Sequence, residues 1–217
     1  MSRATLTISS KNYSAWSLRG WLICKLAAIE FDEIIVEPND ADARAEILLL
    51  SPSILVPCLT YDGIKVWDTL AIAEFLNETA PERGLLPKDK AKRARCRSIC
   101  GEMHSGFVSL RQALPMNIKA HFPNFKVWSK ARADIDRITQ IWRECLGAHG
   151  GPFLFGEISL ADAMYAPVVS RFRTYGVELE SGLNAYADRI WNLPAMQEWR
   201  AAAEQEKEEI EELEVEF

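Results

Sequence analysis

The sequence lacks a long apolar run, an excess of basic residues and a Cys-x-x-Cys motif. No segment approaches the roughly eighteen apolar residues of a membrane span, and the first residues lack the apolar core typical of a signal peptide. Acidic residues outnumber basic ones by 31 to 25, and a net charge of -6 argues against nucleic-acid or anionic-lipid partners. The five cysteines are scattered, which favours reduced thiols. We therefore expect a cytoplasmic globular protein with neither nucleic acid nor membrane as a partner.

What is present in the first eighty residues is an alternation of strand and helix patterns. β-branched runs bounded by turn residues predict strands, and Asp62-Gly63 between two such runs predicts a β-hairpin. In chain order we expect a strand at 5–9, a helix at 15–28, a strand at 33–37, a helix at 40–50, a hairpin at 56–67 and a helix at 69–78. This order predicts a right-handed parallel crossover followed by an antiparallel hairpin.

Beyond residue 87 only helical spacing persists, so the predicted fold class is α/β plus all-α. The segment 80–87 contains Pro81 and Pro87, and we expect it to separate a domain at 1–80 from one at 88–217. Helices are expected at 88–114, 129–146, 160–175 and 194–212. Ser159 and Asp162 predict a capping box at the start of the third. The glutamate-rich end, 204–216, is interpreted as a solvated helix face and not a binding device.

Val56-Pro57 stands at the start of a predicted strand. Proline lacks the N–H that a sheet ladder needs, and X-Pro bonds are the common cis peptides. A cis bond would leave the Val56 backbone free to pair with an extended, peptide-like ligand. The alternative is a trans proline that opens an edge strand.

Two polar segments at helix starts have a structural and a functional interpretation. Asp68-Thr69 can cap the following helix, or the N–H groups there can bind a carboxylate while Asp68 holds an ammonium. An α-amino-acid ligand would need both. The hydroxyls within 12–19 can likewise cap a helix, or stabilise a thiolate together with the helix dipole.

Taken in this order, the motifs resemble those of cytosolic glutathione transferases, in particular bacterial members with an Asn-Tyr-Ser-x-Trp-Ser-Leu-Arg opening. The resemblance covers nearly the whole chain. It implies a thioredoxin-like, glutathione-binding domain at 1–80 and an all-helical domain at 88–217 that contributes the electrophile site. The matching segments are 12–19, 51–57, 67–74, 102–107 and 159–162.

The resemblance also implies which residue activates the thiol. In the serine-type theta, zeta and tau classes, a serine in the loop before the first helix donates a hydrogen bond to the glutathione sulfur and holds it as a thiolate. Alignment from the helix end back through Arg19 puts Ser14 at that position. Ser17 is the second choice, one turn further on, and Tyr13 is the third.

The glutathione site follows from the same resemblance. Val56 would pair with the cysteinyl backbone beside a cis Pro57, and the pair after the hairpin would receive the γ-glutamyl ammonium and carboxylate. Many relatives have Gly-Lys where this chain has Ile54-Leu55, so the cation for the glycyl carboxylate is missing there; Lys11 and Arg44 are the nearest substitutes. The implied glutathione-binding residues are Leu55, Val56, Pro57, Asp68 and Thr69.

The second-substrate pocket is expected between the loop before the first helix and the first long helix of the second domain. Met103, Phe107 and Leu110 form an apolar stripe more typical of a core, which leaves the polar members unexplained. The implied pocket residues are Trp16, Met103, His104, Phe107 and Arg111.

Cys96, Cys100 and His104 share the face of that helix and raise the question of a zinc site. Eight residues of helix span about 12 Å, too far for three ligands that must each lie about 2.3 Å from one ion. We therefore expect no metal.

The function implied is that of a glutathione transferase in detoxification: glutathione, as cosubstrate, attacks a small apolar electrophile as its thiolate. A glutathione-dependent isomerase or peroxidase, and a non-catalytic binding protein of the same fold, are the alternatives. The resemblance further implies a homodimer.

Overall fold

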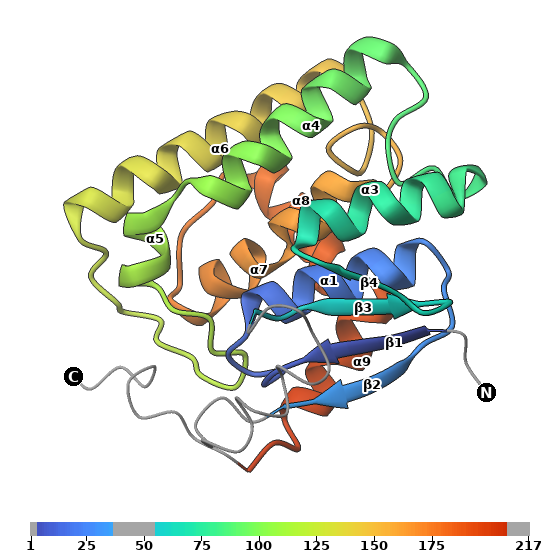
Figure 1. Cartoon of the computed structure of the whole chain (residues 1–217). Helices are drawn as coiled ribbons and strands as arrows, with labels where there is room; N and C mark the ends of the chain where they lie inside the picture. The colour runs from blue at the N-terminus through green and yellow to red at the C-terminus, as the bar shows by residue number, and fades with distance from the viewer. Residues whose placement is uncertain (1–3, 37–54, 208–217) are drawn as a thin grey trace.

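The computed structural model describes residues 4–36 and 55–207 (Figure 1). Its sheet has the strand order β2-β1-β3-β4, in which β1 pairs parallel with β2 and antiparallel with β3, and β3 pairs antiparallel with β4. The strands are β1 (Ala4–Ile8), β2 (Asp32–Ile35), β3 (Cys58–Tyr61) and β4 (Ile64–Trp67). The predicted crossover and hairpin are confirmed. The predicted helix at 40–50 lies outside the described residues.

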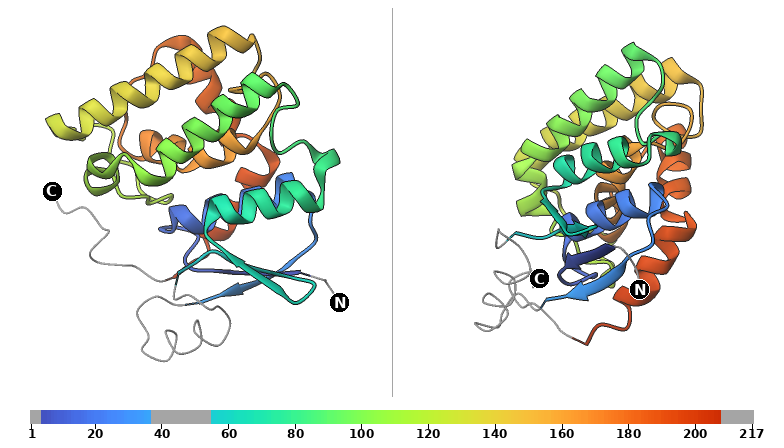
Figure 2. Two further views of the ribbon diagram at one scale, coloured as in Figure 1. Left: turned by 45° about the horizontal axis from the view of Figure 1, so that its top comes forward. Right: turned by 45° about the vertical axis from the view of Figure 1, so that its right-hand side comes forward.

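Two helices of the N-terminal part pack on one face of this sheet (Figures 1 and 2). They are α1 (Ala15–Leu26), which forms the parallel crossover, and α3 (Thr69–Thr79), which follows the hairpin. Leu6 and Ile8 of β1 and Leu59 of β3 are fully buried, because the alternation along each strand turns one row of side chains toward these helices. A short 3-10 turn, Pro81–Arg83, leads into the second part of the chain.

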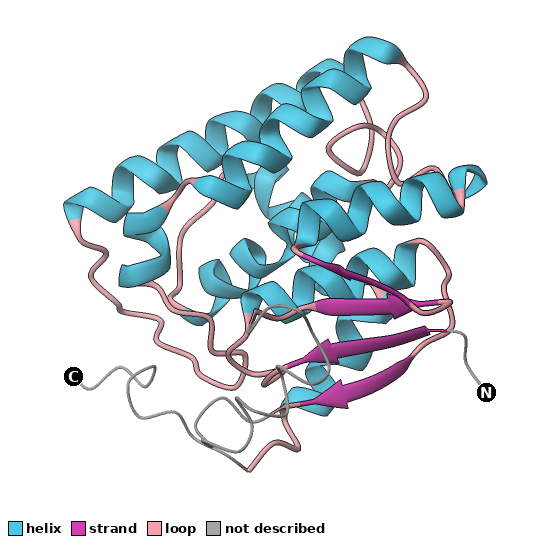
Figure 3. Ribbon diagram, in the orientation of Figure 1, coloured by secondary structure: helices cyan, strands magenta, loops and turns pink. Residues whose placement is uncertain are grey.

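In the second part, as far as residue 207, the regular elements are all helices, apart from two isolated bridges at 153–157 (Figure 3). The central helix α7 (Leu160–Thr174) is buried along almost its whole length and packs against both α1 and α4 (Lys90–Ser105), so it joins the two parts of the molecule. Pro167 lies inside it. The helices are α4 (Lys90–Ser105), α5 (Val108–Ala113), α6 (Ser129–His149), α7 (Leu160–Thr174), α8 (Ser181–Trp191) and α9 (Pro194–Ala203). In the described part of the chain, no helix is long and apolar enough to cross a membrane.

The structure corrects the helix predicted at 88–114. The Gly106 N–H bonds the Glu102 carbonyl and ends α4, and Phe107 then takes a left-handed conformation with φ 58°. A new helix, α5, starts at once because Asp134 of α6 accepts the Leu110 N–H at 2.8 Å. The C-terminal prediction is also wrong in part: α8 was not predicted, and α9 ends at residue 203 instead of running to 212.

The predicted capping box at the start of α7 is confirmed. The Asp162 carboxylate accepts the Ser159 N–H at 2.8 Å and also the Leu154 N–H at 3.2 Å and the Tyr186 hydroxyl at 3.1 Å. Asp162 is fully buried, and the desolvation of its carboxylate outweighs these hydrogen bonds and raises its pKa to about 6. All five cysteines are buried and unpaired.

Candidate active site

A pocket of about 230 Å³ lies between the N-terminal part and α4. It combines residues predicted for the glutathione site with two predicted for the second-substrate site, from four separate segments of the chain. Its lining residues are Trp16, Leu55, Val56, Pro57, Asp68, Thr69 and His104.

One wall of the pocket is the segment that enters β3. The Val56–Pro57 peptide bond is cis, as predicted. Leu55 is exposed, Val56 is half-buried, and Pro57 is buried. Within the described residues, the N–H and C=O groups of Val56 have no hydrogen-bond partner. This segment therefore offers one donor and one acceptor to an extended ligand.

Gly20 of α1 brings the helix against this wall, a contribution that the sequence motifs did not reveal. A Cβ atom added at Gly20 would lie 2.5 Å from Cγ of Pro57, far inside van der Waals contact. The absence of a side chain at this buried position thus lets Pro57 sit directly on α1. A glycine inside a predicted helix was the available signal, because such a residue usually has a packing reason.

The opposite wall is the N-terminus of α3, where Asp68 uses its two carboxylate oxygens differently. Oδ1 accepts the N–H groups of Leu70 at 2.8 Å and Ala71 at 3.3 Å, which caps the helix. Oδ2 lies 3.1 Å from Nε2 of His104. Within the described residues, the N–H of Thr69 has no partner and remains available for an anion.

His104 reaches this wall from α4. Its Nδ1 lies 3.4 Å from the Thr69 hydroxyl, so the ring bridges both residues of the Asp68-Thr69 pair. Trp16 packs edge-on against the same ring, with 5.1 Å between centroids. We predicted His104 for the second-substrate pocket, and the structure places it against the Asp68-Thr69 pair.

Behind Trp16 lies a group of arginines. The guanidinium carbons of Arg19 and Arg111 each stand 4.8 Å from the centroid of its ring. Arg19 is fully buried and donates to the Met164 carbonyl at 2.8 Å, while its Nη1 has no partner in the described part of the chain. Burial and the nearby charges of Arg111 and Arg171 lower the pKa of Arg19. Arg19 and Arg111 therefore pack against Trp16, which lines the pocket, without lining it themselves.

The remaining residues predicted for the second substrate lie elsewhere. Met103 and Phe107 are buried in the hydrophobic core, in agreement with the core interpretation of the stripe. Arg111 belongs to α5, not to the helix of His104, and its guanidinium donates to the carbonyls of Met103 and Gly106 at the end of α4. The break between α4 and α5 thus turns Arg111 back toward Trp16.

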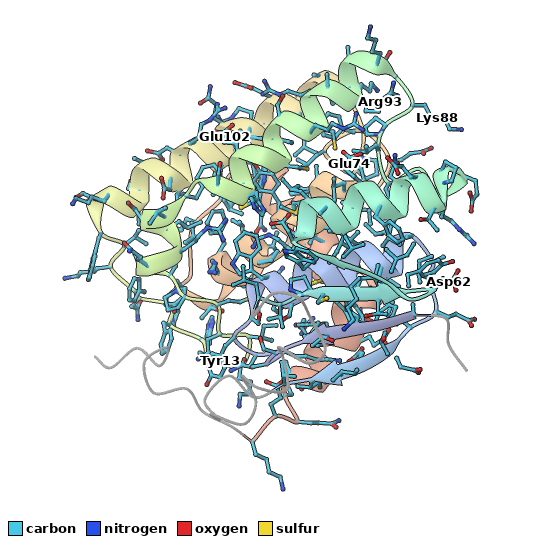
Figure 4. All side chains as sticks on the ribbon, viewed as in Figure 1. Tyr13, Asp62, Glu74, Lys88, Arg93 and Glu102 are labelled. Atoms are coloured by element: carbon cyan, nitrogen blue, oxygen red, sulfur yellow. The ribbon has the colours of Figure 1, made fainter. Side chains whose placement is uncertain are left out.

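The candidate thiol-activating residues form the start of α1. Ser14 is the N-cap: its hydroxyl accepts the Ser17 N–H at 3.2 Å and donates to the Ser17 hydroxyl oxygen at 2.8 Å. Ser17 is fully buried and accepts the Ser9 N–H at 3.0 Å, which is a structural role. Tyr13 is buried near the C-terminal end of β1, at the opposite end of the sheet from Asp62 (Figure 4). None of the three lines the pocket described above, and Ser14 as activator remains a prediction.

Lys11, the predicted substitute for the missing cation, is engaged elsewhere. It is buried, its ammonium lies 2.5 Å from Glu33, and it stands over the rings of Trp21 and Trp199. The Lys11 ammonium is therefore already paired, and its role toward the glycyl carboxylate remains a prediction. Arg44, Ile54 and the acidic residues near 40 lie outside the described residues.

Comparison with known proteins gives consistent results. The chain matches the family models of the glutathione S-transferase N-terminal domain over residues 13–79 and C-terminal domain over 125–203. It is 30% identical to maleylacetoacetate isomerase of Rattus norvegicus over 76% of each chain. It is 33% identical to probable maleylacetoacetate isomerase 1 of Drosophila melanogaster over 77% of this chain and 70% of the relative.

Solved structures share the fold. A glutathione transferase homolog from Burkholderia, solved with bound glutathione, superposes with a TM-score of 0.70 at 20% identity, covering 95% of this chain and 100% of that one. Glutathione transferase Omega 3C from Trametes versicolor gives 0.71 at 22% identity, with 96% and 91% covered.

Proposed function

The chain belongs to the glutathione S-transferase family, a family of enzymes, and we propose on this basis that it binds glutathione in the pocket between Val56 and Asp68 and uses the glutathione thiolate to attack a small electrophile. The observation that carries the proposal is that Val56, with an unpaired backbone N–H and C=O, and Thr69, with an unpaired backbone N–H, line the same pocket. A dipeptide backbone with a terminal α-amino acid group complements this arrangement.

Each part of glutathione has a proposed partner. The cysteinyl N–H and C=O pair with Val56, as a short added strand would. The γ-glutamyl carboxylate accepts from the Thr69 N–H at the start of α3. The γ-glutamyl ammonium lies against Oδ2 of Asp68, which is the oxygen not used for capping.

The chemistry requires the thiol as its anion. A free thiol has a pKa near 8.5, and lowering it by about two units requires roughly 2.7 kcal/mol of preferential stabilisation of the thiolate. One hydrogen bond from the Ser14 hydroxyl and the N-terminal end of α1 together supply about that amount. The thiolate then forms a sulfur–carbon bond to the electrophile. In a substitution the leaving group departs with its bonding electron pair; in an addition the π-electron pair moves to the far atom of the double bond, which takes a proton from water.

A second candidate function is a glutathione-dependent isomerisation. The arginines around Trp16 favour an electrophile with a carboxylate or another anionic group over a purely apolar one. The relatives named maleylacetoacetate isomerase point in the same direction. A thiolate that adds to an activated double bond and is later expelled acts as a catalyst and is not consumed.

We also propose that the protein is a cytoplasmic homodimer, with its domain boundary at 80–87. Ile64 and Trp67 on the edge strand β4 and Val108 on α5 are large exposed apolar side chains. A two-fold interface is self-complementary, so such a surface can serve both partners. Sedimentation as a 24.5 kDa monomer at micromolar concentration would contradict this part of the proposal.

Calorimetry tests the binding site, with glutathione compared against cysteinylglycine, which lacks the γ-glutamyl group. We expect the truncated ligand to bind at least tenfold more weakly, since it makes no contact with the Asp68-Thr69 pair. Equal affinities would contradict the placement.

Product analysis with glutathione and a panel of neutral and carboxylated electrophiles separates the activities: a stable adduct indicates conjugation, an isomer with glutathione recovered indicates isomerisation, and oxidised glutathione with a peroxide indicates peroxidase activity. Binding with none of these products would indicate a non-catalytic protein.

A further inference from the structure

Glu206 lies beyond the end of α9, yet its carboxylate is bound by the loop that joins β1 to α1. The Ser10 hydroxyl donates to Oε2 at 2.7 Å, and the N–H groups of Lys11 and Asn12 donate to Oε1 at 2.5 Å and Oε2 at 3.0 Å. Three donors thus converge on one carboxylate from a segment almost two hundred residues away. Our interpretation of the glutamate-rich end as a solvated face is therefore wrong for Glu206.

The Ser10 hydroxyl links Glu206 by hydrogen bonds to the next residues of the loop. Its single hydrogen is donated to Glu206, so its oxygen is oriented to accept the N–H groups of Asn12 at 3.1 Å and Tyr13 at 3.2 Å. The Ser10 carbonyl accepts the Ser14 N–H at 3.0 Å. A continuous set of hydrogen bonds therefore runs from Glu206 to the N-cap of α1.

Neighbouring contacts fix the other side of the same loop. Trp199 of α9 donates its indole N–H to the Lys11 carbonyl at 2.8 Å. Lys119 donates its backbone N–H to the Asn12 side chain at 3.0 Å and its ammonium to the Glu206 carbonyl at 3.1 Å. These contacts leave the backbone N–H groups of Lys11 and Asn12 in need of an acceptor, and the Glu206 carboxylate supplies it.

We propose that Glu206 is a positioning residue for thiol activation: its carboxylate holds the loop Ser10–Asn12, and through it Ser14, in the arrangement that stabilises the glutathione thiolate. This inference rests on the proposed function. It assigns to the C-terminal segment a part in the chemistry of the N-terminal domain, although Glu206 is not among the residues that line the pocket.

The test is the ultraviolet absorbance of the thiolate against pH, at saturating glutathione, in Glu206→Gln. Gln keeps the size of the side chain, but its amide nitrogen cannot accept from the loop. We expect the pKa of bound glutathione to rise by about one unit and turnover near neutral pH to fall about tenfold, with recovery at higher pH and glutathione affinity within about threefold of wild type. Glu204→Gln is the matched control, because Glu204 is exposed on the same segment, and it should titrate as wild type.

Ser10→Ala interrupts the same set of hydrogen bonds from the other side and keeps the test valid if Glu206→Gln fails to fold. The two substitutions should not be additive: the double variant should shift the titration no more than the larger single shift. A wild-type titration in Glu206→Gln or Ser10→Ala, with the thiolate band present in wild type, overturns the role of Glu206 alone. Absence of the thiolate band from the wild-type protein overturns the proposed function, and this inference with it.

Discussion

Asp68 divides its carboxylate oxygens between the cap of α3 and the pocket, so two substitutions at this position can separate the two roles. Asp68→Asn keeps an oxygen that can accept the N–H groups of Leu70 and Ala71, but it removes the negative charge. Asp68→Ala removes both. If Oδ2 holds the γ-glutamyl ammonium, the two variants should bind glutathione equally weakly but differ in stability.

The magnitudes follow from the exposure of the side chain. A hydrogen bond to a charged group is worth about 1.5–3 kcal/mol, and Asp68 is 41% exposed, so screening by solvent moves the expected loss to the lower end. We expect about 1.5 kcal/mol, or about tenfold in the dissociation constant of glutathione, for both variants. Loss of the cap should destabilise Asp68→Ala by about a further 1 kcal/mol, whereas Asp68→Asn should stay close to wild type.

Titration calorimetry gives the affinities and urea unfolding gives the stabilities. Glu78→Gln is the matched control, since Glu78 is exposed at the other end of the same helix and the substitution makes the same change in net charge. Wild-type affinity in Asp68→Asn would refute the assignment of the ammonium to Oδ2. Equal stabilities of the two Asp68 variants would refute the division of roles.

Three further predictions concern other residues. Ser14→Ala should raise the pKa of bound glutathione by about one to two units. Ser17→Ala should leave that pKa unchanged but destabilise the fold by about 1–3 kcal/mol, because it deprives the buried Ser9 N–H of its acceptor. If thiolate absorbance instead shows the pKa shift in Ser17→Ala and not in Ser14→Ala, the activating residue is Ser17, one turn further on. Gly20→Ala should force Pro57 off α1 and weaken glutathione binding, and an unchanged affinity by calorimetry would contradict this. The pKa of Asp162 is about 6 in the folded chain against 3.8 when unfolded, so the unfolded chain loses this proton first as pH rises. The free energy of unfolding should therefore fall by about 3 kcal/mol between about pH 4 and about pH 6. Asp162→Asn should remove this pH dependence, and a pH profile of urea unfolding identical to that of wild type would contradict the raised pKa.

Local chemistry accounts for what the sequence predicted well. Asp62-Gly63 fixes the hairpin, Ser159 and Asp162 fix the start of α7, and Asp68 fixes the start of α3, because each acts on backbone groups within a few residues. The residues that line the pocket were implied by the resemblance to glutathione transferases. They stand at element ends, where the topology of a crossover and a hairpin brings them together.

Contacts between distant segments account for the differences. The helical spacing of 88–114 is continuous, and no residue near Gly106 indicates that Asp134, on another helix, accepts the Leu110 N–H and so starts a new helix. The glutamates of the C-terminal end look alike in sequence, and Glu206 is distinguished only by the loop that it meets in the fold. His104 was predicted for a pocket, but which wall it joins depends on how α4 lies against α3.

The burial of all five cysteines affects the reactivity of this protein toward oxidised glutathione. Thiol–disulfide exchange needs an accessible thiolate on the protein. Burial raises the pKa of Cys24 to about 12 and also raises that of Cys145. A hydrogen bond with Cys96, together with burial, raises the pKa of Cys100. Cys58, next to Pro57 at the pocket wall, is fully buried. The folded chain is therefore a poor partner for mixed disulfides, and a thiol-selective reagent should modify the ligand long before it modifies the protein that holds it.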